Sequence, residues 1–268
     1  MKTPGEGPDY GNWVSQKLII RMLVLFIVFA ALAVILFLFA ASWGAAAVVL
    51  EVLCIVLALF FLIATGYFIR ARRLFSYTGG KVMQKVLDLV LARIEWDGVG
   101  RAVDIGCGSG ALAIGLAKIY PQARIAGTDY WGGAWGYLQK QCESNAAMEG
   151  VSGRMEFRQA SASALPWPDG AFDLAVSNLV FHEVKDAPDK RDVVLEALRV
   201  VKKGGRFVFQ DLFLLESCFG KMDGFVAFLK SSGIQEVAFV ETGKSAFIPG
   251  ALKLPFMVGT LGLLYGVK

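Results

Sequence analysis

The chain has few of the residues that build metal centres and disulfide frameworks. Its 268 residues include one histidine, His182, and four cysteines, Cys54, Cys107, Cys142 and Cys218. No two cysteines form a Cys-x-x-Cys pair, so the sequence predicts neither a disulfide framework nor a zinc site, and we expect no metal. Free thiols are typical of a protein part that lies in the reducing cytosol.

Strongly charged segments are also missing. The formal net charge is +4, and no long run of lysine and arginine appears, so nucleic acid is not an expected partner. Hydrophobic residues make up 56% of the chain, which is more than an ordinary soluble protein contains. A modest basic excess in such a chain fits contact with anionic lipid, so the first predicted partner is the lipid bilayer.

Two long apolar runs cover residues 22–40 and 45–69, and only Ser42, Trp43 and Gly44 separate them. About 19 residues at about 1.5 Å each nearly span a hydrocarbon core of about 30 Å, so each run predicts a transmembrane helix. A cleaved signal peptide has a shorter apolar core followed by polar mature sequence. The sequence therefore favours a tight transmembrane hairpin.

Basic residues flank this hairpin at both outer ends: Lys17 and Arg21 precede it, and Arg70, Arg72 and Arg73 follow it. Because short cytoplasmic flanks carry an excess of lysine and arginine, both ends are predicted in the cytoplasm. We expect a multi-pass membrane protein with two helices, a cytoplasmic globular domain, and the short turn at the opposite interface.

The predicted regions are a poorly ordered tail over residues 1–16, the hairpin over 17–73 and a globular domain over 74–268. Glu51 interrupts the second apolar run. An intramembrane acid is a functional candidate, but a shallow side chain can also reach interfacial water, and both interpretations stay open.

The globular domain contains the run Val-Asp-Ile-Gly-Cys-Gly-Ser-Gly at residues 103–110, followed by an alanine- and leucine-rich stretch. This pattern predicts a strand, a tight turn and a helix. Glycines at 106, 108 and 110 leave no Cβ between backbone and ligand, and the helix N-terminus attracts negative charge. Such a turn suits a dinucleotide pyrophosphate or the carboxylate of an amino-acid-like cofactor.

Strands and helices alternate through the rest of the domain, which predicts an α/β fold with a doubly wound, mostly parallel sheet. Asp129 ends the second strand about 20 residues after the glycines, where a carboxylate accepts ribose hydroxyls. Trp131, Trp135 and Tyr137 follow it and are candidates to stack on an adenine ring, although some of them are expected in the core. The expected strands cover residues 101–105, 123–128, 155–159, 171–177, 206–210, 236–241 and 261–267; the expected helices cover 81–94, 111–120, 139–149, 189–201 and 225–231, with a turn at 202–205.

Four motifs occur in order: the glycine-rich run at 103–110, Gly-Thr-Asp at 127–129, Leu-Pro-Trp-Pro-Asp-Gly-Ala-Phe-Asp at 165–173, and Leu-Arg-Val-Val-Lys-Lys-Gly-Gly at 198–205. This series resembles the class I S-adenosylmethionine-dependent methyltransferases over roughly residues 77–268. The resemblance implies a Rossmann-like methyltransferase domain and the cofactor S-adenosyl-L-methionine.

The resemblance also implies roles for single residues. The backbone of Gly106, Gly108 and Gly110 would approach the methionine part of the cofactor, Asp104 would help to hold its amino group, and Asp129 would accept the ribose hydroxyls. Ser161 and Ala162 would edge the adenine, although relatives commonly carry an acid where Ser161 stands. The predicted cofactor-binding set also includes Cys107, Tyr130 and Ser177.

Residues 177–183, Ser-Asn-Leu-Val-Phe-His-Glu, follow the fourth strand, and in similar enzymes this strand end faces the methyl group. The predicted catalytic residues are His182, Glu183 and Asn178. His182 titrates near neutrality and is a candidate base. Each of the three also has a structural alternative. His182 is then a structural histidine with all its hydrogen bonds made inside the protein, Glu183 a solvent-exposed acid, and Asn178 a residue that caps a turn. Because a sulfonium cofactor carries an activated methyl group, orientation of the acceptor can suffice.

These features predict a membrane-anchored methyltransferase that acts on a small, hydrophobic or membrane-associated acceptor at the cytoplasmic face. Two alternatives remain. One is a membrane sensor or scaffold that binds S-adenosylmethionine without catalysis, and the other is a nicotinamide enzyme. The oligomeric state is not predicted.

Overall fold

The structure is a computed structural model that describes residues 7–131 and 137–268, without the side chains of residues 40–43. It divides into two compact units, each described here by itself. One unit is Asn12–Met83, and the other combines Met1–Gly11 with Gln84–Lys268. The first unit thus includes residues that precede and follow the predicted hairpin.

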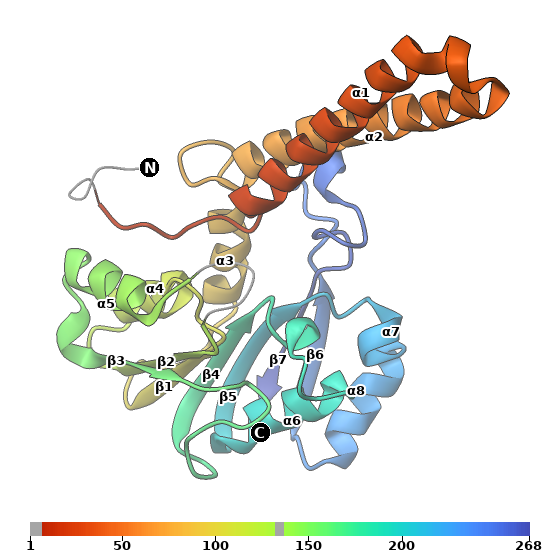
Figure 1. Ribbon diagram of the computed structural model, residues 1–268. Coiled ribbons are helices and arrows are strands. Elements are labelled where there is room, and N and C mark those ends of the chain that lie inside the picture. Colours follow the sequence, from red (N-terminus) through yellow and green to blue (C-terminus); the bar gives the residue numbers. More distant parts are fainter. Residues whose placement is uncertain (1–6, 132–136) are drawn as a thin grey trace. The chain divides into compact units, whose positions relative to one another are not determined.

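The unit Asn12–Met83 contains two long antiparallel helices, α1 (Gln16–Trp43) and α2 (Ala45–Phe75) (Figure 1). The stretches Gln16–Phe39 and Ala45–Phe75 are long and apolar enough to cross a membrane, and 11% of each apolar window is buried. The length and composition of the two helices thus indicate two candidate membrane spans. Trp43, which is predicted at the membrane interface, lies outside the described side chains.

The segment before α1 is specifically bound to the end of α2, in contrast to the predicted poorly ordered tail. The Asn12 side chain donates to the Arg72 carbonyl at 2.9 Å, and the Arg72 guanidinium donates to the Val14 carbonyl. The rings of Trp13 and Phe75 lie 5.3 Å apart. The glycine, proline and polar residues of the tail predicted disorder, but side-chain contacts with a distant helix end hold the segment before α1 in place.

The second unit is an α/β domain built on a seven-stranded sheet of order β3-β2-β1-β4-β5-β7-β6 (Figure 1). The strands from β1 to β5 are parallel, and β7 is antiparallel to both β5 and β6. The bounds are β1 Arg101–Ile105, β2 Arg124–Asp129, β3 Met155–Gln159, β4 Phe172–Asn178, β5 Val201–Asp211, β6 Glu236–Glu241 and β7 Gly262–Val267. The order reverses between β1 and β4, where ligands bind in open sheets of this type.

Helices cover both faces of the sheet, as the alternation of strands and helices predicts. One face packs against α3 (Val82–Ala92), α4 (Ala111–Ile119) and α5 (Gln139–Met148). The other packs against α6 (Lys190–Arg199), α7 (Glu216–Phe219) and α8 (Met222–Ser231). The short 3-10 helices are Ser152–Arg154, Phe181–Glu183 and Gly250–Leu252.

The predicted turn at residues 202–205 is wrong, because β5 continues through this stretch. The strand absorbs the extra residues as an irregularity: Phe172 pairs with Val201, whereas Leu174 pairs with Arg206. Gly204 takes a positive φ of 73° there. The pattern of lysines and glycines resembles a turn, but backbone bonds from residues 204 and 205 to Lys268 keep it in the sheet.

Candidate active site

The glycine turn joins β1 to α4 at the carboxyl edge of the sheet. Gly106, Gly108 and Gly110 have φ values of 71°, 56° and 82°, in the region that favours glycine. The amides of Gly106 and Cys107 both donate to the Thr128 carbonyl, at 2.7 and 2.9 Å. A Cβ on Gly106 would stand 2.1 Å from the Val180 side chain. The glycines are therefore required both by the turn and by close packing around it.

Asp104 lies beneath this turn and is 1% exposed. Its Oδ2 accepts the amide of Ala113, in the first turn of α4, at 2.9 Å. Burial raises the pKa of Asp104 to about 8; the Ala113 bond opposes this rise, and the neighbouring Asp129 carboxylate adds to it. Asp104 thus anchors the helix to the strand and carries a proton at neutral pH in this state.

Asp129, at the end of β2, is positioned by two backbone amides. Its Oδ2 accepts from Gly108 at 2.9 Å, and its Oδ1 accepts from Trp131 at 2.8 Å. The Trp131 indole donates back to the Gly108 carbonyl at 2.9 Å. Each carboxylate oxygen has a second lone pair. The group can therefore still accept ligand hydroxyls beside the turn.

Aromatic side chains lie at the turn as expected, although not all in the expected role. A Cβ built on Gly108 would lie 3.3 Å from the Tyr137 ring, so this ring covers the backbone that a ligand would approach. A cofactor must therefore stack on Tyr137 or displace it. Trp131 is 7% exposed and Tyr130 is 70% exposed. Trp135 lies outside the described residues.

Cys107 packs in a small cluster with Cys142, a residue that the sequence did not single out. Cys142, on α5, is fully buried, and its thiol donates to the Gly108 carbonyl at 3.1 Å. Burial raises the pKa of the Cys107 thiol well above its usual value. Cys107 is therefore a thiol beside the turn, not a thiolate nucleophile.

A strap of N-terminal residues, Asp9 to Gly11, also contacts the turn. Asn145, on α5, donates to the carbonyls of Asp9 and Ser109 at 2.8 and 2.9 Å. The Ser109 hydroxyl donates to the Tyr10 carbonyl at 3.0 Å. Nothing local in the sequence signals this contact, because it joins residues that are far apart in the chain.

Ser161, which follows β3, lies beside an acid from another loop. The carboxylate of Asp186 accepts from the Ser161 hydroxyl at 3.1 Å and from the Ser163 hydroxyl at 2.7 Å. These two bonds lower the pKa of Asp186, which is exposed. Ala162, in contrast, is buried in the core. The structure thus supplies a carboxylate next to Ser161, which the sequence alone does not reveal.

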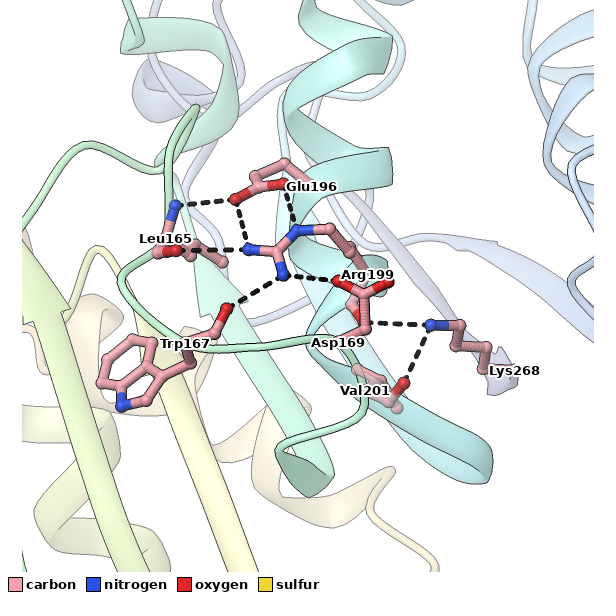
Figure 2. A network of polar contacts seen from close by, with 7 residues as sticks. All are labelled: Leu165, Trp167, Asp169, Glu196, Arg199, Val201 and Lys268. Atoms are coloured by element: carbon pink, nitrogen blue, oxygen red, sulfur yellow. Dashed lines mark hydrogen bonds and ion pairs between the residues drawn. The ribbon is translucent and has the colours of Figure 1, made fainter.

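The proline-rich motif at 165–173 is held by a network of polar contacts around Arg199 (Figure 2). Its guanidinium donates to the carbonyls of Trp167 and Leu165 at 2.9 and 3.2 Å, and bonds Glu196 and Asp169. The Glu196 carboxylate in turn accepts the Leu165 amide at 2.7 Å. Arg199 and Glu196 therefore fix the loop between β3 and β4, in which the buried Trp167 Nε1 has no hydrogen-bond partner among the residues described.

Ser177 and Asn178 are the last two residues of β4, which ends one residue later than predicted, and their side chains point to opposite faces of the sheet. The Ser177 hydroxyl is buried and donates to the Ile105 carbonyl at 2.8 Å, which joins β4 to β1. Asn178 is partly exposed, and its Oδ1 has no hydrogen-bond partner among the residues described. Leu179 follows with a φ of 57°, a rare conformation for a leucine.

His182 is held between two carboxylates. Its Nδ1 contacts Asp211 Oδ1, and its Nε2 lies 3.5 Å from Glu183 Oε1. Burial alone would lower its pKa, but the attraction of Asp211 and Glu183 outweighs this and raises the pKa to about 10. Asp211 is fully buried and also accepts the amides of Val180 and Phe181, at 3.0 and 2.7 Å. In this state His182 is an imidazolium that fixes the loop after β4, and it has no free nitrogen to act as a base.

The candidate residues therefore gather at the carboxyl edge of β1 to β5. A cleft of about 400 Å³ lies elsewhere, among the side chains of Arg93, Arg206, Lys230 and Tyr265. It opens at the opposite edge of the sheet and contains none of the predicted site residues. Among residues 7–131 and 137–268, no three His, Cys, Asp or Glu side chains are grouped to hold a metal.

Comparison with known proteins gives a family match for part of the domain. Residues 103–209 match the family model described as a methyltransferase domain. The chain is 33% identical over 119 residues to a ubiquinone/menaquinone biosynthesis C-methyltransferase of Pseudomonas fluorescens, covering 43% of this chain and 44% of that protein. It is 32% identical over 120 residues to 27-O-demethylrifamycin SV methyltransferase of Amycolatopsis mediterranei, covering 44% and 40%. The chain thus spans less than half the length of these relatives.

Solved structures agree on the fold. Geranyl diphosphate C-methyltransferase from Streptomyces coelicolor, in complex with Mg²⁺, geranyl diphosphate and S-adenosyl-L-homocysteine, superposes with a TM-score of 0.54. The identity is 15%, and the match covers 70% of this chain and 80% of that one. Residues 103–209, from β1 to β5, are thus similar to a methyltransferase domain, and the seven-stranded sheet has the Rossmann-like fold of the solved structure.

Proposed function

We propose that the protein is a membrane-anchored methyltransferase that uses S-adenosylmethionine and methylates a small apolar or membrane-associated acceptor at the cytoplasmic face. The observation that carries the cofactor assignment is the pairing of the glycine turn with Asp129, whose carboxylate is bonded to the Gly108 amide. The match of residues 103–209 to a methyltransferase domain supports the reaction type.

The residues present fit the cofactor. The Tyr137 ring covers the backbone at Gly108, so a ligand at the turn would replace this ring or stack on it. Asp129 would accept hydrogen bonds from the ribose hydroxyls. The Asp104 carboxyl group, directly beneath the turn, would attract the cofactor's ammonium group when the carboxyl group ionises. The neighbouring residues Gly106, Cys107 and Gly110 would shape the cradle without bonding through their side chains.

Asp186 could replace the acid that relatives commonly carry at the position of Ser161, near the expected adenine edge. Ser161 carries no charge, but with Ser163 it holds the Asp186 carboxylate in place. A carboxylate can accept the N–H bonds of an exocyclic amine. We assign Asp186 as the acid that would face the adenine amine, with Ser161 as the residue that positions it.

The surroundings of His182 favour transfer without a histidine base. The bound cofactor supplies an activated methyl group, so this chain's residues mainly have to orient the acceptor and exclude water. His182 is protonated and paired on both sides in this state. Its role would then be to hold the loop that carries Asn178, which is the predicted catalytic residue that retains an unpartnered oxygen among the described residues.

The apolar hairpin supports the choice of acceptor. Helices α1 and α2 meet the length and composition of membrane spans, and anchoring an active site near a bilayer raises its encounter rate with molecules dissolved there. The basic residues at both outer ends of the hairpin support a cytoplasmic catalytic domain. The named relatives methylate different molecules, so they do not select one acceptor.

The test is to incubate the purified full chain, in nanodiscs, with methyl-labelled S-adenosylmethionine and a total membrane extract. We expect label in an apolar product and one S-adenosylhomocysteine per methyl transferred. Asp129→Asn should weaken cofactor binding, measured by calorimetry, by about tenfold or more, because a neutral amide accepts ribose hydroxyls less strongly. Asp223→Asn, at an exposed position of α8, is the matched control.

Three results would contradict the proposal in different ways. Cofactor binding without S-adenosylhomocysteine formation in any extract would identify a sensor or scaffold. Binding of a nicotinamide cofactor in place of S-adenosylmethionine would identify an oxidoreductase. Methylation of soluble molecules only, by the full chain, would remove the preference for a membrane-associated acceptor.

A further inference from the structure

A second polar group lies beside Asn178 at the carboxyl edge of the sheet. Gln210, the penultimate residue of β5, pairs with Asn178 of β4 in the parallel register and with Leu263 of β7. Paired residues of neighbouring strands point to the same face. The two amide side chains are therefore neighbours on the face that packs against α3 and α4.

Gln210 is fully buried, but its hydrogen bonds are incomplete. Its Nε2 donates to the hydroxyl of Thr242, just after β6, at 3.2 Å. Its Oε1 and the Oδ1 of Asn178 are both buried atoms without a partner in the part of the chain that the structure describes. Buried polar atoms are nearly always paired, so each exception calls for an explanation.

The surroundings of these two oxygens define what can bind them. The residues that precede them on the same face are apolar: Val176 on β4 and Val208 on β5 are at most 2% exposed. Asp104 pairs with Val176 in the strand register, so its carboxyl group lies on the same face. Two carbonyl oxygens in such a place attract a hydrogen-bond donor and disfavour an anion.

The connection between β6 and β7 lies at the same edge, because β6 runs parallel to β5 and β7 returns (Figure 1). It covers residues 242–261, and the amides of Thr242 and Gly243 close its base on the Leu261 carbonyl. It exposes apolar side chains, Leu254 at 37% and Phe256 at 67%. Long irregular connections of this kind are often binding loops or lids.

We propose that Gln210 and Asn178 form the specificity site for the methyl acceptor, and that they bind a hydroxyl or N–H donor of an otherwise apolar molecule. This inference rests on the proposed function. Thr242 is a positioning residue, because its bond to Nε2 orients the Gln210 oxygen. The connection at 242–261 moves to admit the ligand and contacts its apolar body.

The proposal is tested with two probes of similar size, 2-naphthol and naphthalene. 2-Naphthol has a hydroxyl group that can donate a hydrogen bond, and naphthalene has no donor. Binding of each to the full chain in nanodiscs is measured by equilibrium dialysis, with empty nanodiscs as the blank. We expect 2-naphthol to bind about tenfold more tightly, as one satisfied hydrogen bond provides. In Gln210→Leu this preference should fall below about threefold.

Two further variants complete the test. Asn178→Leu changes a partly exposed side chain and should reduce the preference by itself, which keeps the test valid if Gln210→Leu does not fold. Gln122→Leu alters an exposed glutamine outside the site and should retain the full preference. Equal binding of the two probes by the unaltered chain, or a preference that survives both site variants, would overturn the proposal.

The melting temperature separates a ligand-binding role from a structural one. Gln210→Leu removes an unpaired buried oxygen together with the Nε2 bond to Thr242, so we expect the two effects to offset and the melting temperature to change little. A fall of several degrees with the 2-naphthol preference retained would mean that Gln210 only stabilises the fold. Calorimetry with S-adenosylmethionine on the same samples tests the proposed function separately from the acceptor site. If the unaltered chain does not bind S-adenosylmethionine, the proposed function is contradicted, whatever the result with the two probes.

Discussion

His182 illustrates how a residue's surroundings change its chemistry. A histidine at the end of β4 is a natural candidate base, but Asp211 and Glu183 raise its pKa to about 10. A folded-state pKa above the unfolded value of about 6.5 contributes stability that is fully present below pH 6.5. That contribution is lost as the pH rises through about 10.

We therefore expect His182→Gln to lower the free energy of unfolding by about 1–3 kcal/mol at pH 6, and by much less at pH 10.5. Urea unfolding of the full chain in detergent, followed by tryptophan fluorescence, measures both values. Glu183→Gln alters a half-exposed partner and should cost under about 1 kcal/mol. An equal effect of His182→Gln at both pH values would show that the imidazole is neutral.

Asp104 behaves in the opposite way to a surface carboxylate. Its pKa is raised from 3.8 to about 8 by burial, so the stability linked to its proton is complete below pH 3.8 and is lost as the pH rises through 8. Asp104→Asn keeps an oxygen for the Ala113 amide and removes the buried charge.

At pH 9 this variant should stabilise the cofactor-free protein by on the order of 1–3 kcal/mol and weaken binding of S-adenosylmethionine. Denaturant midpoints at pH 6 and pH 9 measure the first effect, and calorimetry measures the second. Asp97→Asn, at an exposed turn, serves as the control. If the two midpoints shift equally, ionisation of Asp104 does not oppose folding.

At the scale of elements, the loop between β3 and β4 depends on one side chain of α6. The Arg199 guanidinium joins two backbone carbonyls of this loop to Asp169 and Glu196 (Figure 2). The hydrogen bond with Glu196, more than the bond with Asp169, raises the pKa of Arg199 further above its usual value. Loss of these donors leaves loop carbonyls without partners.

Arg199→Met retains the apolar stem and removes the donors, so it should destabilise the domain by about 2–4 kcal/mol. It should also expose residues 161–170 to protease. Arg191→Met removes an exposed ion pair with Asp189 and should cost under about 1 kcal/mol. Limited proteolysis and thermal melting of both variants test the expectation, and equal stability of the two would contradict it.

At the scale of the whole molecule, α1 and α2 are the candidate membrane spans. Their apolar side chains are largely exposed, for example Leu32 at 42% and Val56 at 57%. Exposed apolar surface of this extent is stable in lipid and costly in water.

We expect the full chain to remain in the membrane pellet after extraction with alkaline carbonate. The double variant Leu32→Arg, Val56→Arg should reduce the fraction of protein that stays in the membrane pellet. Each charge at a helix centre costs about 2.5–3.5 kcal/mol on insertion scales. Val99→Arg, at an exposed site of the globular domain, should leave the fraction unchanged. Release of the unaltered chain by carbonate would rule out a spanning hairpin.

The sequence by itself determined those features that depend on local pattern. The apolar runs predicted α1 and α2, and strand and helix periods predicted the α/β sheet with its glycine turn and Asp129. It failed where the answer lies in residues distant in the chain. The turn expected at 202–205 became part of β5 because Gly204 and Gly205 bond Lys268.

Only the tertiary structure decided the partners of the site residues. Folding brings Asp211 to His182, Asp186 to Ser161, Asn145 to Ser109 and Gln210 to Asn178. The two residues of each pair come from separate elements, so no spacing or periodicity in the sequence indicates that they are in contact. Charge state and hydrogen bonding depend on such neighbours and on burial, which is why the roles of these residues, unlike the fold, could not be predicted from the order of amino acids.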